Sequence, residues 1–347
     1  MKLRFRWRRS LGVAVCAVAL ASWACIGDGG DGDDGVGSAA TTAVATKRWV
    51  LSNVHTSGYP TPRGLVRFAE RVEAEPLLSK RIDVDLQLGG VLGNEKETLE
   101  KLRFGALQAV CSSTAPLAEF AESIGVLSLP YLFRDAEHMW AVLEGEVGRQ
   151  LSADLMGAGF VALAWYDAGA RSFYNRRRPV RRLEDLAGLK IRVQRSEIMH
   201  DTVAALGASP AALGFKQVYT SLHTGAIDGA ENNLPSYRSE RHFEAAPFYS
   251  LDRHSMIPDV LLVARKDWES LSSEEQEAVR RAGRESALEQ RRFWEEYVEE
   301  AREMVLEAGS EIHEIEDPEA FRRAVRPVYE KHAERYGDLV ERIRAVM

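Results

Sequence analysis

The sequence predicts an α/β protein with two domains, and three observations support this. The chain of 347 residues exceeds the size at which one hydrophobic core usually stops growing. Strand-like and helix-like segments alternate through its first third, which is typical of helices packed on parallel strands. Residues 272–308 have the pattern of a single helix that is long enough to reach across two domains.

The first segments alternate between strand and helix patterns. Residues 49–51 are apolar and open a short strand, and residues 63–74 carry apolar side chains on one helical face. Residues 82–88 alternate between apolar and polar, as in a half-buried strand. Asn94 can cap the next helix, and residues 107–111 form another apolar strand. This order predicts strands that pair in parallel.

Three segments continue the pattern. Residues 126–135 are apolar but contain a proline, which predicts an extended segment outside the centre of a sheet. Residues 136–158 are predicted to be a helix, and residues 160–165 a strand. The middle of the chain therefore keeps the α/β character of its beginning.

A strand predicted at residues 190–194 carries an informative side chain. Because successive side chains of a strand point to opposite faces, Lys190, Arg192 and Gln194 share one polar face. A guanidinium on an otherwise apolar scaffold is costly to bury unless an anion meets it. Arg192, together with Arg171 about twenty residues earlier, is therefore a candidate for binding an anion.

The longest predicted helix begins after Ser272, which can form a capping box with Glu275, and it ends before Gly309. At about 1.5 Å per residue, a helix of this length spans on the order of 50 Å, which is longer than a small domain. It is predicted to bridge both domains. A coiled-coil dimer helix is the alternative, although the apolar stripe recurs in fours more than in a heptad pattern.

The beginning of the chain predicts export. Basic residues precede the apolar run 11–21, which is too short to span a bilayer but suits a signal peptide over residues 1–24. Cys25 follows as at a bacterial lipoprotein cleavage site, so it is the predicted lipidation site; ordinary or twin-arginine secretion are the alternatives. Residues 25–46 are rich in Gly and Asp and have little to bury, which predicts a flexible tether.

Charge and motifs argue against two classes of function. Removing residues 1–24 takes away five of the 45 basic residues and none of the 52 acidic ones, which leaves a net charge of −12 and argues against nucleic acid as a partner. The sequence has no GxSxG elbow, P-loop, HExxH or cysteine pair at metal-ligand spacing, so we predict no enzyme, cofactor or metal site. Cys111 is predicted to be a small buried residue.

Four motifs follow one another along the chain: LGNEKETLEKLRFGAL at 92–107, GARSFYN at 169–175, LAGLKIRVQ at 186–194 and VYTSLHTGAIDGAENN at 218–233. This series resembles the substrate-binding proteins of tripartite ATP-independent periplasmic (TRAP) transporters, of the type that binds dicarboxylates or sialic acid. The resemblance covers nearly everything after the tether. It implies a two-lobed, type II-like periplasmic-binding-protein fold of mixed sheets flanked by helices, with the long helix spanning both lobes.

The resemblance also implies where the lobes begin and end. Lobe I would comprise residues 47–168 and 257–297, and lobe II residues 169–256 and 298–347. Proteins of this family close their lobes on the ligand. The binding residues are therefore expected to come from both lobes.

Site residues follow from the matching motifs. In the family, the arginine of the GLKIRV-like strand forms a bidentate salt bridge with a ligand carboxylate, and here that residue is Arg192. Arg171 would assist, while Asn232 and Phe215 correspond to a polar and an aromatic residue beside the ligand. Further candidates come from loops and strand ends near the expected cleft: His55, Tyr59, Ser113, Thr114, Trp165, Tyr166 and Gln194.

Together these features predict an exported solute-binding protein that captures a small organic acid by hinge closure and delivers it to the integral-membrane subunits of a TRAP transporter. The alternative is a lipid-anchored sensor or scavenging binding protein of the same fold without a transporter partner, which the tether would also suit. Ala170, Ala212 and Leu213 depart from the residues common in the family, so the sequence does not identify the acid.

Overall fold

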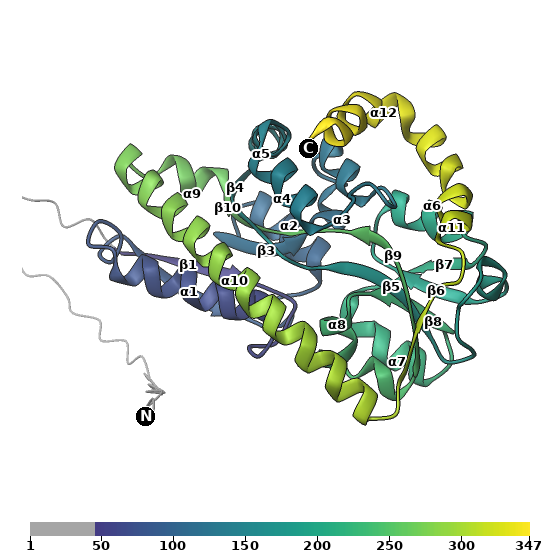
Figure 1. The fold of residues 1–347 in the computed structure, drawn as a ribbon. Helices are drawn as coiled ribbons and strands as arrows, with labels where there is room; N and C mark the ends of the chain where they lie inside the picture. Colours follow the sequence, from purple (N-terminus) through teal and green to yellow (C-terminus); the bar gives the residue numbers. More distant parts are fainter. Residues whose placement is uncertain (1–45) are drawn as a thin grey trace, which may run out of the picture. The chain divides into compact units, whose positions relative to one another are not determined.

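The computed structural model describes residues 46–347, which contain two β-sheets with helices around them (Figure 1). The first sheet has the strand order β2-β1-β3-β10-β4. Its strands are β1 (Lys47–Ser52), β2 (Ile82–Gln87), β3 (Ala109–Ser113), β4 (Phe160–Tyr166) and β10 (Asp259–Ala264). Strand β1 pairs in parallel with β2 and β3, as predicted, whereas β10 runs antiparallel to β3 and β4.

The second sheet has the strand order β11-β9-β5-β8-β6-β7. Its strands are β5 (Ala170–Asn175), β6 (Lys190–Val193), β7 (Ser209–Ala212), β8 (Gly229–Asn232), β9 (Phe248–Met256) and β11 (Glu311–Glu314). Strand β6 pairs in parallel with β7 and β8, and β5 runs antiparallel to β8 and β9. Both sheets are therefore mixed, and the predicted fold class is confirmed.

Helices flank both sheets (Figure 1). The α-helices are α1 (Pro60–Ala74), α2 (Glu95–Arg103), α3 (Thr114–Leu117), α4 (Ala136–Glu144), α5 (Glu146–Gly157), α6 (Glu197–Ala205), α7 (Val218–His223), α8 (Leu234–Ser239), α9 (Arg265–Glu269), α10 (Ser273–Glu307), α11 (Pro318–Ala324) and α12 (Arg326–Ala345). Short 3-10 helices are η1 (Glu122–Ser128), η2 (Leu183–Leu186), η3 (Phe215–Gln217) and η4 (His242–Glu244).

Helix α10 reaches across both sheets, as predicted (Figure 1). The predicted capping box starts it: the Ser272 hydroxyl accepts from the Glu275 amide, and the Glu275 carboxylate accepts from the Ser272 amide. The helix packs against α1 and β4 on the side of the first sheet and against α8 on the side of the second. Ala301 and Val305 join the apolar cluster on the second sheet. A long helix shared by two cores needs no dimer partner to bury its apolar stripe.

The chain crosses from the first sheet to the second between β4 and β5, and the middle of α10 holds this crossing. The Gln290 side chain accepts from the Asp167 amide and donates to the Asp167 carbonyl, both over 2.8 Å. Helix α1 approaches closely at Gly64, where an added Cβ would lie 2.7 Å from Cβ of Gln290. The return crossing, between β9 and β10, is formed by residues 257–258.

Two predicted elements differ from the structure. The single helix predicted over 136–158 is broken into α4 and α5 at Gly145, whose backbone is extended (φ −85°, ψ −158°). The apolar pattern continues across the break, so periodicity did not reveal it. The extended segment predicted over 126–135 is wrong for residues 126–128, which end the 3-10 helix η1 because their side chains turn into the core.

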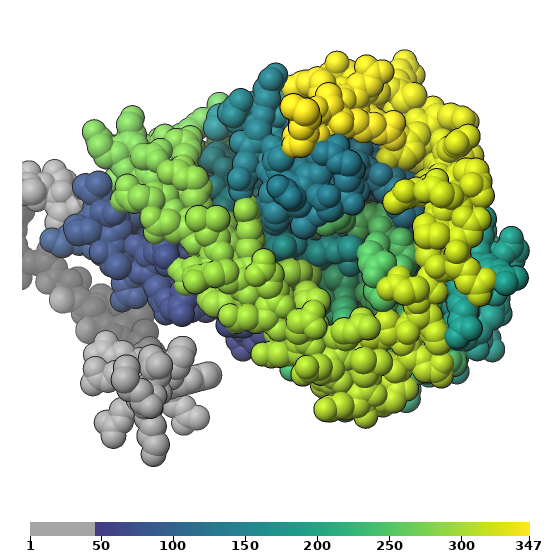
Figure 2. Space-filling model, in the orientation of Figure 1, coloured from purple at the N-terminus to yellow at the C-terminus, as the bar shows by residue number. Residues whose placement is uncertain are grey.

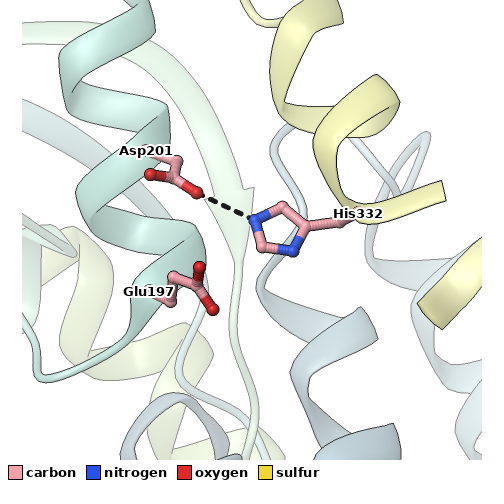
Figure 3. A group of neighbouring side chains, drawn as sticks. All are labelled: Glu197, Asp201 and His332. Atoms are coloured by element: carbon pink, nitrogen blue, oxygen red, sulfur yellow. Dashed lines mark hydrogen bonds and ion pairs between the residues drawn. The ribbon is translucent and has the colours of Figure 1, made fainter. Parts of the chain in front are cut away.

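Helix α12 is joined to α6 by a network of charges (Figure 3). His332 Nε2 lies 2.9 Å from Asp201 Oδ2, and Lys331 Nζ lies 2.7 Å from Asp201 Oδ2 and 3.1 Å from Glu197 Oε1. The ligand atoms of Glu197, Asp201 and His332 lie within 4.8 Å of one another, close enough in principle to hold a metal ion. The Lys331 ammonium already supplies the cation between these carboxylates, so the cluster is a salt-bridge network between two helices.

Apolar side chains are buried on both sheets. Cys111, in strand β3 of the first sheet, is 1% exposed and therefore buried, as predicted. No helix within this range combines the length and the apolar character needed to cross a membrane. The predicted signal peptide, the lipidation site Cys25 and the tether up to residue 45 lie outside the described residues.

Candidate ligand-binding site

A small cavity of about 20 Å³ lies between elements of the two sheets, well below the range of about 300–1,000 Å³ for small-molecule sites. Loops and helix ends beside the first sheet contribute some of its walls, and strands β5 and β8 contribute others. Seven of the predicted residues line it: His55, Tyr59, Ser113, Arg171, Gln194, Phe215 and Asn232. Folding therefore brings together side chains that are up to 177 positions apart.

Arg192 lines a neighbouring cavity, also of about 20 Å³. Glu95 and Phe215 line both cavities, so these two side chains lie between the two spaces. The Arg192 side chain is 2% exposed, and its Nε donates to the Leu213 carbonyl over 2.9 Å. Burial lowers the pKa of Arg192. Among the described residues, no carboxylate lies within 4.0 Å of this guanidinium, which is costly for a buried cation.

Arg171 differs from Arg192 because it is already paired. Its Nε and Nη2 donate to the two carboxylate oxygens of Glu231 over 2.5 and 2.9 Å, and Nη2 also donates to the Glu231 carbonyl. Its Nη1 donates to Asn232 Oδ1 over 2.9 Å. The guanidinium has five N–H groups, and four of them donate to groups within the protein. One N–H, on Nη1, is left for a ligand. The geometry makes Arg171 chiefly a support for Asn232.

Two more charged side chains, His254 and Asp252, extend the pair of Arg171 and Glu231. His254 Nδ1 lies 2.9 Å from Asp252 Oδ2, and its Nε2 lies 3.5 Å from Glu231 Oε2. Burial would lower the pKa of His254, but Asp252 and Glu231 outweigh burial and raise it to about 9, so the ring is protonated at neutral pH. Burial would likewise raise the pKa of Glu231, but Arg171 and His254 lower it to about 2. Alternating charges thus neutralise one another in the core.

Asp252, the last of these charged side chains, borders a hollow on the surface. Tyr131, Asp252 and Arg253 line this hollow together with Pro318 and Arg322 of α11. The face shown in Figure 2 is recessed beside the C-terminal residues. The Tyr131 hydroxyl donates to Asp252 Oδ2 over 3.4 Å. Tyr131 and Arg253 have positive backbone φ angles of 55° and 48°, which residues other than glycine rarely adopt. The contact links the segment after η1 to strand β9.

Aromatic side chains form one wall of the cavity. The His55 ring stacks on Tyr59 with 3.8 Å between centroids, and the edge of His55 meets Phe215 at 5.0 Å. Burial, together with Lys216 and Arg171, lowers the pKa of His55 to about 3, so the ring is neutral. Its Nδ1 has no hydrogen-bond partner among residues 46–347, and neither has Oε1 of Gln194. When a polar ligand is present, His55 Nδ1 can accept or donate a hydrogen bond according to the tautomer, and Gln194 Oε1 can accept one.

Sequence reasoning missed two acidic residues of the cavity, Glu95 and Asp259. Burial raises the pKa of Glu95, and burial together with Glu95 raises the pKa of Asp259 to about 7. A signal for Asp259 was available, because it is the one charged residue of the strand DVLLVA. Glu95 lies in the motif at residues 92–107, directly after the helix cap Asn94. Asn233 and Ser236 from the start of α8 complete the missed polar lining.

Three predicted residues line neither of these two cavities. The Tyr166 hydroxyl contacts Ser286 Oγ over 2.6 Å, inside the apolar cluster beneath α10. Trp165 points to the other side of β4, into a surface hollow between α4 and α10. Thr114 begins α3 with its side chain fully buried. Trp165 and Tyr166 are adjacent in a strand, so their side chains point to opposite faces, and neither face borders the cavity.

Comparisons with known proteins show the family of the chain. The model of the family "Bacterial extracellular solute-binding protein, family 7" matches residues 51–336. A solute-binding protein of Chromohalobacter salexigens is 35% identical over 302 residues, which cover 87% of this chain and 89% of that protein.

Solved structures of TRAP periplasmic solute-binding proteins have the same fold. One from Roseobacter denitrificans, with bound β-D-glucuronate, is 39% identical with a TM-score of 0.84 and covers 87% of this chain and 100% of that one. Another from a Bradyrhizobium species, with bound D-galacturonate, is 40% identical with a TM-score of 0.83 and covers 86% and 99%. Both relatives are periplasmic solute-binding proteins of the TRAP type. The chain therefore belongs to family 7 of the bacterial extracellular solute-binding proteins and is a solute-binding protein of the TRAP type, as its motifs predicted.

Proposed function

We propose that this protein captures a hexuronate, a six-carbon sugar acid, and delivers it to the membrane subunits of a TRAP transporter. Glucuronate and galacturonate are the ligands in relatives that are 39% and 40% identical to this chain. The observation that carries the proposal is the buried guanidinium of Arg192, which has no carboxylate partner among residues 46–347.

The charges around the cavity favour Arg192 as the residue that binds the carboxylate. Arg171 is neutralised by Glu231, and His254 by Asp252. Arg192 uses its Nε for Leu213, so its two terminal nitrogens are free to form the paired hydrogen bonds that match a carboxylate. An ion pair shielded from water is stronger than one at the surface. A ligand carboxylate would thus complete the set of buried charges.

The same proposal assigns roles to the cavity residues. The ligand carboxylate would reach Arg192 between Glu95 and Phe215, which border both spaces. The sugar ring would lie against His55 and Phe215, because an aromatic wall suits the apolar face of a pyranose. Hydroxyl groups would meet the polar side chains of the cavity, namely Tyr59, Ser113, Gln194, Asn232 and the remaining N–H of Arg171.

Isothermal titration calorimetry of residues 46–347 with D-glucuronate and D-galacturonate tests this proposal. Arg192→Lys keeps the charge but loses the fork, so affinity should fall at least about tenfold. The matched control is Arg182→Lys, an exposed arginine paired with Glu316, which should bind like the parent. D-glucose and D-galactose, which lack the carboxylate, should not bind measurably. Equal affinity of the Arg192→Lys variant and the parent would remove Arg192 from the site.

We propose that the ligand enters while the two lobes are open and that the lobes then close on it about a hinge. We propose the lobe boundaries given above, residues 47–168 and 257–297 against residues 169–256 and 298–347, with the hinge at the crossings between β4 and β5 and between β9 and β10. Because lining residues belong to both sheets, a ligand would bind the closed form more tightly and shift the population towards it. Small-angle scattering should show a smaller radius of gyration with ligand; an unchanged radius contradicts closure.

We also propose that the exported protein is anchored by a lipid at Cys25. The residues before Cys25 and the Gly/Asp-rich sequence after it support this. In cells grown with a radiolabelled fatty acid, the protein should carry label and sediment with membranes, and a Cys25→Ser variant should do neither. An unlabelled parent protein in the soluble periplasmic fraction would favour ordinary or twin-arginine secretion.

A further inference from the structure

Two carboxyl groups lie in the cavity on either side of Ser113. The Ser113 amide donates to Glu95 Oε1 over 3.0 Å, and in the antiparallel pair of β3 and β10 Ser113 stands opposite Asp259. Asp259 Oδ2 accepts a hydrogen bond from the Thr61 hydroxyl over 3.1 Å. The two acids come from α2 and β10, but both line the same space.

Neither acid has a cationic partner. Within residues 46–347, no Lys, Arg or His nitrogen lies within 4.0 Å of the Glu95 or Asp259 carboxyl oxygens. A carboxylate offers about four positions to hydrogen-bond donors. Asp259 has the Thr61 hydroxyl as a donor, and Glu95 has the Ser113 amide and the side chain of Gln194. Arg192 and Arg171 act on Glu95 only from beyond 4.0 Å. Two like charges, one half-buried and one buried, are unfavourable side by side, so further donors should be needed to satisfy them.

A sugar hydroxyl is well suited to this position. A hydroxyl donates to an ionised carboxyl group and accepts from a protonated one, so it can bind whichever form is present. A second carboxylate on the ligand would instead be a third negative group beside Glu95 and Asp259. Like charges placed face to face cost several kcal/mol in recognition and serve to reject wrong partners.

We propose that Glu95 and Asp259 form a hydroxyl-binding subsite that excludes anions, so that the protein accepts polyhydroxylated acids with one carboxylate and rejects diacids of the same carbon number. The inference rests on the proposed function, because it requires that Arg192 hold the single carboxylate. Glu95 borders the space that Arg192 lines, whereas Asp259 lines only the other space. The end that excludes anions is therefore the one at Asp259, and Glu95 lies between this end and Arg192.

Matched open-chain acids test the exclusion. D-gluconate and D-glucarate have the same carbon skeleton and differ at one end, where a CH2OH group is replaced by a carboxylate; D-galactonate and galactarate form a second pair. Calorimetry with the parent protein should show each diacid binding at least about tenfold more weakly than its monoacid. D-glucuronate and D-galacturonate serve as positive references, and Arg192→Lys should weaken all of them.

Variants then assign the exclusion to the two acids. In the double variant Glu95→Gln and Asp259→Asn, the amides can donate to a carboxylate, so the ratio between diacid and monoacid affinity should come within about threefold of one. Glu100→Gln, on the same helix but outside the cavity, is the control and should keep the ratio of the parent. Circular dichroism and melting temperature verify that each variant is folded.

The outcomes separate this inference from the function beneath it. If no sugar acid binds the parent, the proposed function fails and this inference fails with it. If monoacids and diacids bind the parent equally well, only the exclusion is refuted. If the double variant loses both ligands in equal proportion, Glu95 and Asp259 support the fold of the site and do not select its ligand.

Discussion

Replacing Glu231 by glutamine would preserve the size of the side chain while removing the charge that holds Arg171. The pair is buried, with side-chain exposures of 6% and 0%, and Arg171 forms two hydrogen bonds to the Glu231 carboxylate and one to its carbonyl. Breaking such a pair leaves the guanidinium buried and uncompensated. His254 would also lose one of its two acidic neighbours.

The size of the effect follows from the pKa of Glu231. Its pKa is lowered from 4.5 to about 2, which corresponds to about 3 kcal/mol of preferential stabilisation of the charged form. Removal of one partner from a buried pair costs a similar amount, about 3–5 kcal/mol. We therefore expect Glu231→Gln to lower the free energy of unfolding by about 3 kcal/mol at pH 7.

Urea unfolding followed by circular dichroism measures this difference. The control is Glu316→Gln, which breaks the exposed pair with Arg182 and should cost at most about 1 kcal/mol. Because the pKa of Glu231 is lower in the folded than in the unfolded state, its contribution is present above pH 4.5 and disappears as the pH falls towards 2. A loss no greater than that of the control at pH 7 would refute the argument.

Two further predictions concern the cavity and the crossing beneath α10. Burial and Glu95 raise the pKa of Asp259 from 3.8 to about 7, with Arg171 and Asp167 also nearby, so its stabilising proton is present at low pH and is lost as the pH rises through 7. Asp259→Asn, which cannot ionise, should therefore raise the melting temperature of the ligand-free protein more at pH 8 than at pH 5; an equal change at both would contradict this. Gln290→Leu leaves the Asp167 amide and carbonyl without partners and should cost about 1–3 kcal/mol for each in urea unfolding, whereas the exposed Glu303→Gln on the same helix should cost little.

Local patterns were sufficient for most of the fold. The parallel strands β1 to β3 and the capping box at Ser272 lie where the sequence predicted them, because apolar period and cap chemistry act over a few residues. The sequence did not predict the break between α4 and α5 at Gly145, because the apolar period continues through it. The antiparallel entry of β10 between β3 and β4 also went unpredicted, since it pairs strands almost 100 positions or more apart.

The candidate site divides in the same way. The family resemblance pointed to seven residues that the fold brings to one cavity, as well as to Arg192 beside it. Strand alternation could not tell that Trp165 and Tyr166 both face away from the cavity, because that depends on what covers each face of β4. Asp259 looked like one more charge at the end of a strand, although it is 5% exposed.

By itself, the sequence determined the family and the order of many elements, since these depend on short motifs and local periodicity. It also predicted Arg192 as the arginine that meets an anion. Only the tertiary structure decided how the buried charges are shared. It paired Arg171 with Glu231 and left Arg192 without a carboxylate among residues 46–347. It also brought Glu95 and Asp259 to opposite sides of Ser113. Electrostatic energy depends on distance and burial in space, and residues 60 to 170 positions apart acquire both only when the chain folds.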